Sequence, residues 1–275
     1  MDNDDAQVGR ILNRREILFL LGGAGALVAV GAACSDSNSK GAATAGPSTS
    51  TPGSATTAGS TSASTSAATT AAATKMPTCV VSPALTEGPY FVDEKLNRSD
   101  IRPDTSTGTA SAGMPVLLGF NVSGVGAAGC TALAAVVVDV WHCDAVGVYS
   151  DASDRSFNTK GKNFLRGSQV TDSAGQAKFT TIFPGWYPGR AVHIHFKVRG
   201  AAAGGKSYEF TSQLFFHEAQ IDEIFMGVPY SSKGSGRLMN ASDGIYNQGG
   251  QALLLPLTKT DEGYAGTFDI GVKLA

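Results

Sequence analysis

Seven short apolar runs, each bounded by turn residues, constrain most strongly what this chain can fold into. They are rich in Val, Phe, Thr and Tyr, which suit a pleated sheet, and Gly, Asp, Asn and Ser lie between them. The runs, between Val116 and Val272, are VLLGFNV, LAAVVVDVW, QAKFTTIF, AVHIHFKV, YEFTSQLFF, ALLLPL and YAGTFDIGV. Their succession predicts an all-β fold, an antiparallel β-sandwich. A helical period occurs at residues 217–226, HEAQIDEIFM.

Residues 151–173, between two of these runs, have the composition of a long loop. Loops of this length in compact domains usually build a site or lie disordered. We therefore expect long site-forming loops on the sandwich.

The start of the chain has the layout of an export signal over residues 1–34. Arg14 and Arg15 precede an apolar run of Gly, Ala, Leu and Val that ends in small residues before Cys34. The paired arginines resemble a twin-arginine signal, and a Sec signal with two arginines in its basic region is the alternative. No basic stop-transfer flank follows the run, so a cleaved signal is favoured over a permanent membrane helix.

After the signal, the chain divides into a polar tract and a folded part. Residues 35–75 contain mainly Ser, Thr, Ala and Gly, with almost no large apolar side chain, so we expect a disordered linker that acts as a tether. Residues 76–275 have the length of one large β-rich domain. The net charge of -2, with no basic block after Arg15, argues against nucleic acid as a partner.

The four cysteines bear on location and on cross-linking. Cys34 closes the apolar run and precedes a polar stretch, which favours a lipoprotein cysteine, although Gly31 stands where such motifs usually carry a larger aliphatic residue. Cleavage nearby and release is the alternative. We expect an exported protein, extracellular or at the cell surface, with membrane attachment through lipidated Cys34. In an oxidising compartment two of Cys79, Cys130 and Cys143 can pair, and the sequence does not determine which.

Two of the four histidines are one residue apart on a predicted strand. Successive side chains of a strand point to opposite faces, so His193 and His195 project side by side. Val192, Ile194 and Phe196 point the other way, into the core, which would leave the two imidazoles on one surface. Two neutral imidazoles at this spacing form a natural metal-binding pair. For an isolated H-x-H sequence, solvent-facing or hydrogen-bonded histidines are the alternative.

Two tyrosines accompany the histidine pair. Tyr187 lies on a turn between Gly185 and the Pro188–Gly189 pair, where a bulky phenol has no packing reason to be. Tyr149 follows an apolar strand and a short turn. Each tyrosine alone is better explained as a core or rim aromatic residue.

Three segments together resemble the intradiol ring-cleavage dioxygenases, the family of catechol 1,2-dioxygenase and protocatechuate 3,4-dioxygenase. They are LTEGPYFVDE, VDVWHCDAVGVYS and GWYPGRAVHIH. The shared signature is an apolar strand with Asp139, a Gly-x-Tyr sequence ending at Tyr149, and later a tyrosine followed by Arg-x-x-His-x-His. The resemblance runs from about Cys79 to Phe216.

The resemblance implies a non-haem Fe(III) site and a role for each matching residue. Tyr149, Tyr187, His193 and His195 match the four iron ligands of the family. Tyr187 matches the ligand that a bound catechol displaces, and Tyr149 the one that stays. A hard ferric ion favours anionic phenolate oxygens, and a bound metal lowers the pKa of a phenol enough to make it an anion. Four protein ligands of this kind leave a position for substrate, as in a catalytic site.

Two further residues match positions around the substrate. Arg190 matches an arginine that lies over the bound ring, where it would stabilise developing negative charge. Gln213 matches a glutamine on the oxygen-binding side of the pocket. The implied reaction cleaves a catechol between its hydroxylated carbons with O2 and gives a cis,cis-muconate-type diacid, a step in the catabolism of aromatic compounds.

Other features distinguish this chain from the cytoplasmic members of the family. A signal and a linker occupy the place of their helical dimerisation region, so no oligomeric state is predicted, and the layout resembles the secreted actinobacterial members. Tyr90 is a candidate substrate-binding residue, with a rim tyrosine as the alternative. We expect His142 to support the ligand residues or to be structural, and His217 to lie at a helix start or on the surface.

Two other functions were weighed against the dioxygenase. A non-catalytic cell-surface binding module with a transthyretin-like sandwich would use the tyrosines as contact residues, but it has no need for all four ligand types together with Arg190. A zinc hydrolase fits poorly, because the candidate partners of the histidines are tyrosines and not carboxylates.

Overall fold

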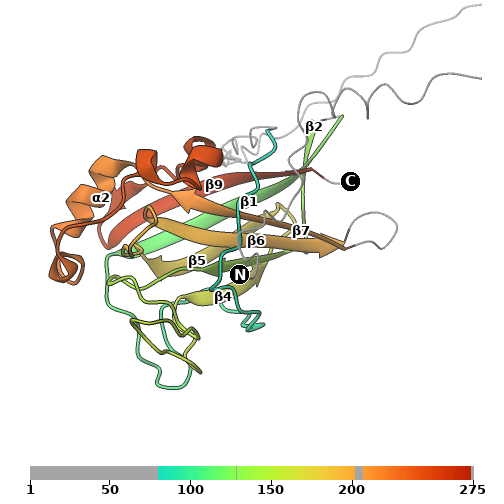
Figure 1. Ribbon diagram of the computed structural model, residues 1–275. Helices are drawn as coiled ribbons and strands as arrows, with labels where there is room; N and C mark the ends of the chain where they lie inside the picture. The colour runs from blue at the N-terminus through green and yellow to red at the C-terminus, as the bar shows by residue number, and fades with distance from the viewer. Residues whose placement is uncertain (1–79, 128, 202–206, 274–275) are drawn as a thin grey trace, which may run out of the picture. The chain divides into compact units, whose positions relative to one another are not determined.

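The computed structural model describes residues 80–127, 129–201 and 207–273 (Figure 1). The export signal, the linker, Cys34 and Cys79 lie outside the described residues. The described part consists mainly of strands in two sheets, which confirms the predicted β-sandwich. The strands are β1 (Pro115–Gly126), β2 (Gly129–Ala132), β3 (Val137–Trp141), β4 (Arg166–Val170), β5 (Gln176–Ile182), β6 (His193–Ala201), β7 (Ser207–Phe215), β8 (Thr258–Thr260) and β9 (Gly263–Lys273).

The two sheets differ in strand order. One sheet has the order β2-β1-β9-β8, with β5 also paired to β1, and the other has the order β4-β3-β6-β7. The strand pairs are antiparallel except β1 and β9, which run parallel along ten residue pairs from Val116–Tyr264 to Val125–Lys273. The alternating apolar pattern does not distinguish parallel from antiparallel partners, so the sequence did not predict this pair.

Aromatic side chains join the inner faces of the sheets. Phe196 of β6 lies 5.4 Å from Phe120 of β1 and 6.4 Å from Phe268 of β9, measured between ring centroids. Ile194, Phe196 and Val198 have no exposed surface. Full burial of a large apolar side chain contributes about 1.5–3 kcal/mol, so these residues hold β6 firmly in the core.

The opposite face of β6 is also buried, contrary to the expectation that His193 and His195 lie on a surface. Each has only 2% of its surface exposed. The chain from residue 83 to 93 runs over this face: Leu85 N–H donates to Thr211 O (3.1 Å), and Lys197 lies 3.9 Å from the centroid of the Phe91 ring. The expectation failed because strand periodicity separates the two faces of a strand but does not say what covers them.

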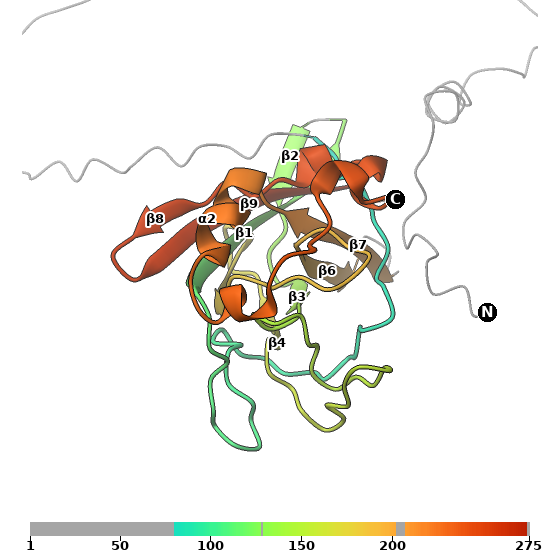
Figure 2. The same cartoon turned by 60° about the vertical axis from the view of Figure 1, so that its left-hand side comes forward.

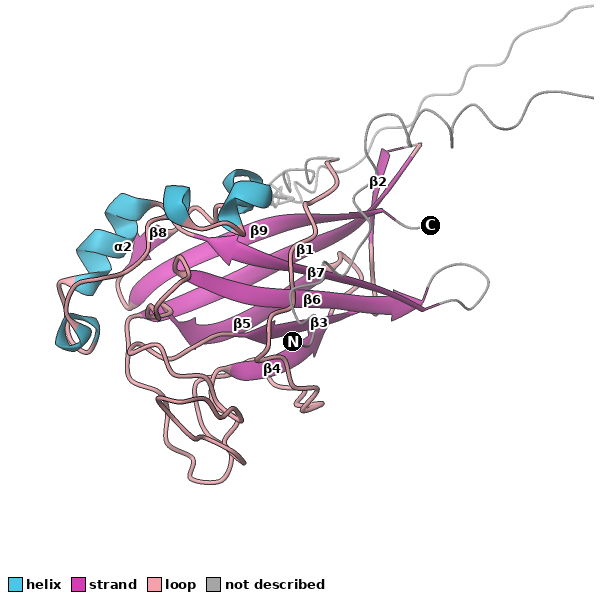
Figure 3. Ribbon diagram, in the orientation of Figure 1, coloured by secondary structure: helices cyan, strands magenta, loops and turns pink. Residues whose placement is uncertain are grey.

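Helical segments follow β7 at the C-terminal part of the domain. Helix α2 (Glu218–Phe225) confirms the predicted helix and buries Ile221 and Ile224. Short 3-10 helices follow at η1 (Tyr230–Lys233), η2 (Asn240–Ser242), η3 (Tyr246–Gln248) and η4 (Gly250–Leu253). These helices and the long loops lie at the same end of the strands, at the left in Figures 1 and 3 and toward the viewer in Figure 2. Within residues 80–127, 129–201 and 207–273, no helix is long and apolar enough to cross a membrane.

Two expectations about single segments were wrong. The predicted loop 151–173 contains strand β4, whose sequence RGSQV is too polar to be recognised as a strand. The apolar run 252–257 forms no strand: η4 ends at Leu253, and the following residues make one isolated bridge, Phe215–Leu254. Pro256 removes a backbone donor from this run, and its leucines reach the core without a sheet ladder.

The described cysteines have different states. Cys130 is disulfide-bonded, whereas Cys143 is free and buried. Cys143 is therefore not the partner of Cys130.

Candidate metal centre

The two histidines meet at their Nε2 atoms, which are 3.0 Å apart. Both residues belong to β6, with His195 opposite Trp141 of β3 and Gln213 of β7. His193 Nδ1 lies 2.6 Å from Ala191 O, which fixes the proton on Nδ1 and leaves the Nε2 lone pair available. The ring of His195 stacks on that of Trp141, with centroids 4.9 Å apart. Both imidazoles are thus held in the orientation that binding of one shared metal ion would require.

Two phenol oxygens lie beside these nitrogens. Tyr187 Oη is 3.2 Å and Tyr149 Oη 3.4 Å from His193 Nε2. Four donor atoms, two oxygens and two nitrogens, therefore surround one small volume. Tyr149 is 1% exposed, whereas Tyr187 is only partly buried.

Glycines bring the two tyrosine-bearing turns into contact. A Cβ on Gly147 would lie 2.1 Å from Trp186 O, and one on Gly185 would lie 2.4 Å from Ala145 O. Gly147 also has a φ of 84°, which favours glycine. The Gly-x-Tyr sequence is thus needed so that the backbones before Tyr149 and Tyr187 can pack against each other.

The donor set fits a metal ion. Metal-bound nitrogen and oxygen atoms lie about 2.0–2.2 Å from an ion, so neighbouring ligands are roughly 2.8–3.6 Å apart at angles of about 90–110°. The measured separations of 3.0, 3.2 and 3.4 Å fall in this range. In the described part of the chain, no group of three His, Cys, Asp or Glu side chains is placed to hold a metal, so the phenol oxygens are needed to complete this site.

Burial affects the four ionisable groups in a way that suits a bound cation. It lowers the pKa of His193 and His195, so both imidazoles are neutral and can act as ligands. It raises the pKa of Tyr149 and Tyr187, with a further rise for Tyr149 from the neighbouring Tyr187. The two phenols therefore ionise only if a cation compensates for the lost hydration.

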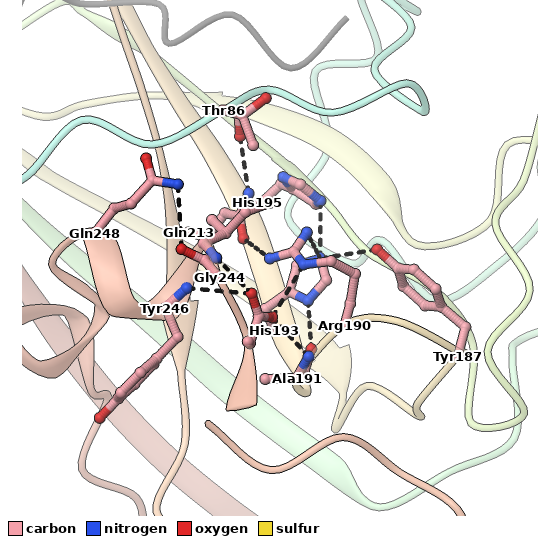
Figure 4. Close-up of polar contacts among 12 residues, drawn as sticks. Thr86, Tyr187, Arg190, Ala191, His193, His195, Gln213, Gly244, Tyr246 and Gln248 are labelled. Atoms are coloured by element: carbon pink, nitrogen blue, oxygen red, sulfur yellow. Dashed lines mark hydrogen bonds and ion pairs between the residues drawn. The ribbon is translucent and has the colours of Figure 1, made fainter. Parts of the chain in front are cut away.

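Arg190 and Gln213 lie together next to these donors (Figure 4). Arg190 Nη1 is 3.5 Å from His193 Nε2, and Arg190 Nη2 donates to Gln213 Oε1 (2.5 Å). Gln213 is fully buried, and its Nε2 donates to Thr86 O (2.8 Å). The structure thus brings both residues to the site, from the turn before β6 and from β7.

Tyr90 also reaches the tyrosines. Its ring stacks on Tyr149 with centroids 4.5 Å apart and meets the edge of Tyr187 at 6.4 Å. Its hydroxyl donates to Asp154 Oδ2 (3.1 Å). Gly88, two residues earlier, has a φ of 73°, and a Cβ there would lie 3.3 Å from His195 Cε1. The segment around Gly88 and Tyr90 is therefore packed closely over the donor atoms.

The remaining two histidines take no part in the cluster, as predicted. His142 is buried and bonded to Cys143 O (2.8 Å) and Thr181 Oγ1 (2.7 Å), and burial lowers its pKa to about 4. His217 is exposed and directly precedes α2.

Two charged residues near the site were missed by sequence reasoning. Asp243 accepts from Arg190 Nε (3.0 Å), and Arg166 is 2% exposed and donates to Ser150 O (2.6 Å), next to Tyr149. Asp243 lies beyond the part of the chain that carries the resemblance, and Arg166 lies in the predicted loop. No periodicity or motif in the sequence marks either residue.

Comparisons with known proteins point to one family. A sequence model of the family described as "Dioxygenase" matches residues 86–250, more than half of the chain. The protocatechuate 3,4-dioxygenase beta chain of Burkholderia cepacia is 32% identical over 108 residues, which are 35% of this chain and 45% of that protein's own length. The structure of an intradiol ring-cleavage dioxygenase from Tetranychus urticae has a TM-score of 0.60 at 29% identity, over 71% of this chain and 95% of that one.

Proposed function

The chain belongs to the family of intradiol ring-cleavage dioxygenases, and on that premise we propose that it is an iron enzyme that opens catechol-type rings. Its substrates would be catechols and O2, and the ring would break between the two hydroxylated carbons. Both oxygen atoms of O2 enter the product, so catechol itself would give a diacid of the cis,cis-muconate type. The observation that carries the proposal is the convergence of two phenol oxygens and two imidazole nitrogens on one volume.

We assign Tyr149, Tyr187, His193 and His195 as the residues that would hold Fe(III). The chemistry supplied by bound ferric iron is chelation of both catechol oxygens and withdrawal of electron density from the ring, which makes the ring reactive toward O2. The phenols match this hard ion in charge and donor type better than they match a structural zinc.

The two tyrosines would have different parts in substrate binding. A catechol must lose two hydroxyl protons to bind through both oxygens as an anion; Tyr187 Oη would accept one of them and hydroxide from solvent the other. Tyr187 suits this part because it lies on a turn and is partly exposed. Tyr149 is 1% exposed and is covered by the ring of Tyr90, so it would remain in place.

Arg190 would supply a fixed positive charge beside the bound ring. Its guanidinium is held between Asp243 and Gln213, with only 15% of the side chain exposed. A preorganised charge needs no reorganisation when negative charge develops on the ring, and such groups contribute roughly 3–4 kcal/mol to transition-state stabilisation. Gln213 and Tyr90 would border the ring and the oxygen.

We further propose that the enzyme is exported. Residues 1–34 have the layout of an export signal, with Arg14 and Arg15 before an apolar run, and Cys34 is placed for lipidation. Residues 35–75 would then act as a tether between the cell surface and the catalytic domain. Such an enzyme would act on aromatic compounds outside the cytoplasm.

Iron content, colour and turnover of the purified full-length chain test the catalytic proposal together. We expect one iron per chain, a broad visible band from phenolate-to-Fe(III) charge transfer, and a shift of this band on adding catechol without O2. With O2 admitted, one O2 should be consumed for each catechol, and the ultraviolet band of a muconate should grow. A colourless protein that carries one zinc per chain and consumes no O2 would overturn the proposal.

A further inference from the structure

Asp243 is a buried carboxylate whose two oxygens accept hydrogen bonds from two separate segments of the chain, residues 190–191 and residues 245–246. It directly follows η2, and its side chain is 1% exposed. Oδ1 accepts from Ile245 N–H (2.7 Å) and Tyr246 N–H (3.3 Å), whereas Oδ2 accepts from Arg190 Nε (3.0 Å) and Ala191 N–H (2.7 Å). The carboxylate thus ties the C-terminal 3-10 segment (residues 240–253, from η2 to η4) to the turn that leads into β6.

One of these hydrogen bonds connects Asp243 to the proposed iron ligand His193 through a single residue, Ala191. Asp243 holds the N–H of Ala191, and the carbonyl of Ala191 accepts from His193 Nδ1 (2.6 Å). The contact on Nδ1 decides which nitrogen of the ring carries the proton and how the ring is turned. The position of Asp243 is therefore transmitted to His193 Nε2.

The other contact fixes the plane of the Arg190 guanidinium. Asp243 accepts from Nε, Gln213 Oε1 accepts from Nη2, and Gln213 is itself held by Thr86 O. Two anchors on different nitrogens leave a planar group little rotational freedom, so Nη1 is held toward His193.

Charge gives a second reason for a carboxylate at this place. Arg190 Nη1 lies 3.5 Å from His193 Nε2, so a cation bound to that nitrogen and the guanidinium would be close neighbours. Like charges in a buried site repel strongly, because little water screens them. A carboxylate paired with Arg190 offsets this repulsion. The pKa of Asp243 is below its usual value, since Arg190 and backbone N–H groups outweigh the effect of burial, and the group is an anion at neutral pH.

We propose that Asp243 is a positioning residue of this site, which holds Arg190 over the substrate and His193 in its metal-binding tautomer. The proposal rests on the iron-dependent function proposed above. It assigns the C-terminal 3-10 segment, which supplies no ligand, a direct influence on substrate binding and turnover.

The test compares Asp243→Asn with a matched change, Asp139→Asn, in the full-length protein. Asp139 is also a buried carboxylate paired with an arginine, Arg199 (2.8 Å). Within the described residues, neither Asp139 nor Arg199 forms a hydrogen bond or ion pair with the four donor residues or with Arg190. We expect Asp243→Asn to lower kcat/KM by about 10–100-fold and to weaken catechol binding in an O2-free titration of the visible band. Asp139→Asn should change both by less than about threefold, although it lowers the melting temperature.

A double-mutant cycle separates positioning from a general loss of stability. If Asp243 acts partly through Arg190, Asp243→Asn should lower kcat/KM by a clearly smaller factor when Arg190 is already Ala, and the loss that remains is the part exerted through Ala191 and His193. Full additivity of the two changes would overturn this part of the proposal. If Asp243→Asn does not give folded protein, Asp243→Glu takes its place in the cycle, with the same expectation of non-additivity.

A measurement on the metal-free protein keeps this inference distinct from the proposed function. The His193 Nδ1 proton, held by Ala191 O, should give a slowly exchanging downfield NMR signal that Asp243→Asn makes exchange at least about tenfold faster. An unchanged exchange rate, with wild-type kcat/KM, would overturn the role of Asp243. Absence of iron binding and turnover in the wild-type protein would instead contradict the proposed function.

Discussion

The ring of Tyr90 stacks on the ring of Tyr149, with centroids 4.5 Å apart and planes inclined by 23°. The two residues are 59 positions apart in the sequence. The segment before β1 therefore forms one wall of the candidate site, and a proposed iron ligand depends on it for its packing.

Replacing Tyr90 tests this wall. Tyr90→Ala removes the stacked ring, and since such aromatic pairs contribute about 0.5–1.5 kcal/mol, we expect KM for catechol to rise roughly 2- to 10-fold. Tyr90→Phe is the control, because it keeps the ring and loses only the exposed hydrogen bond to Asp154. Steady-state kinetics of both variants should separate them; equal values would mean that the stack does not matter.

Tyr187→Phe should affect colour and turnover more than stability. The change removes one of the four donor atoms, so we expect the visible band to weaken and shift and kcat to fall by about 100-fold or more, as for loss of a proton-transfer group. The melting temperature of the metal-free protein should change little, because the ring remains. Wild-type activity in this variant would show that Tyr187 is not the displaced ligand.

Removal of the metal should abolish activity without unfolding the domain. The main core of the sandwich lies between the inner faces of the sheets and does not include the four donor side chains; Tyr149 and Tyr187 belong to a separate, smaller cluster around Trp141. Dialysis against a chelator should therefore remove colour and turnover and leave the far-ultraviolet circular dichroism unchanged. Added iron should restore both properties, and added zinc should restore neither. The melting temperature should rise with iron, since the folded state alone presents the site.

Gly147 and Gly189 offer a matched pair of glycines with positive φ, 84° and 88°. Gly189→Ala meets no atom within 4 Å, so it should cost only about 1–2 kcal/mol of backbone strain. Gly147→Ala adds a backbone overlap at Trp186 O, and we expect an additional loss of at least about 2 kcal/mol in the free energy of unfolding. Urea unfolding of the two variants measures this difference. Equal losses would show that the turn with Gly147 can move away from Trp186 at no cost in free energy.

His142 should make the domain less stable in mild acid. Its pKa is about 4 in the folded protein and 6.5 when unperturbed, so between these values the unfolded chain binds a proton that the folded one does not. Stability is therefore fully present above pH 6.5 and falls as the pH decreases toward 4, by up to about 3 kcal/mol. His142→Gln should remove this part of the pH dependence. Urea unfolding at pH 7 and pH 4.5 compares the two proteins, and an identical slope in both would contradict this account.

The sequence predicted the elements with strong periodicity and missed those without it. Alternation in residues 191–198 correctly separated the core-facing Ile194 from His193 and His195. It could not show that residues 83–93 cover the histidines, because that depends on contacts distant in sequence. Strand β4 was missed because Arg166 and its neighbours are polar, although Arg166 is buried. Asp243 was not recognised for a similar reason: its role comes from four hydrogen bonds that the fold brings together.

The parallel pairing of β1 with β9 determines when this domain can fold. Val116 and Tyr264 are neighbours in that ladder although nearly 150 residues separate them. Contacts so distant along the chain slow folding, because a large loop must close before they form. The five-stranded sheet also cannot be completed until the last strand has been synthesised. A ribosome-bound chain would thus stay incompletely paired until residues 263–273 have left the ribosome, and a truncation before Gly263 would leave β1 with an open edge prone to aggregation.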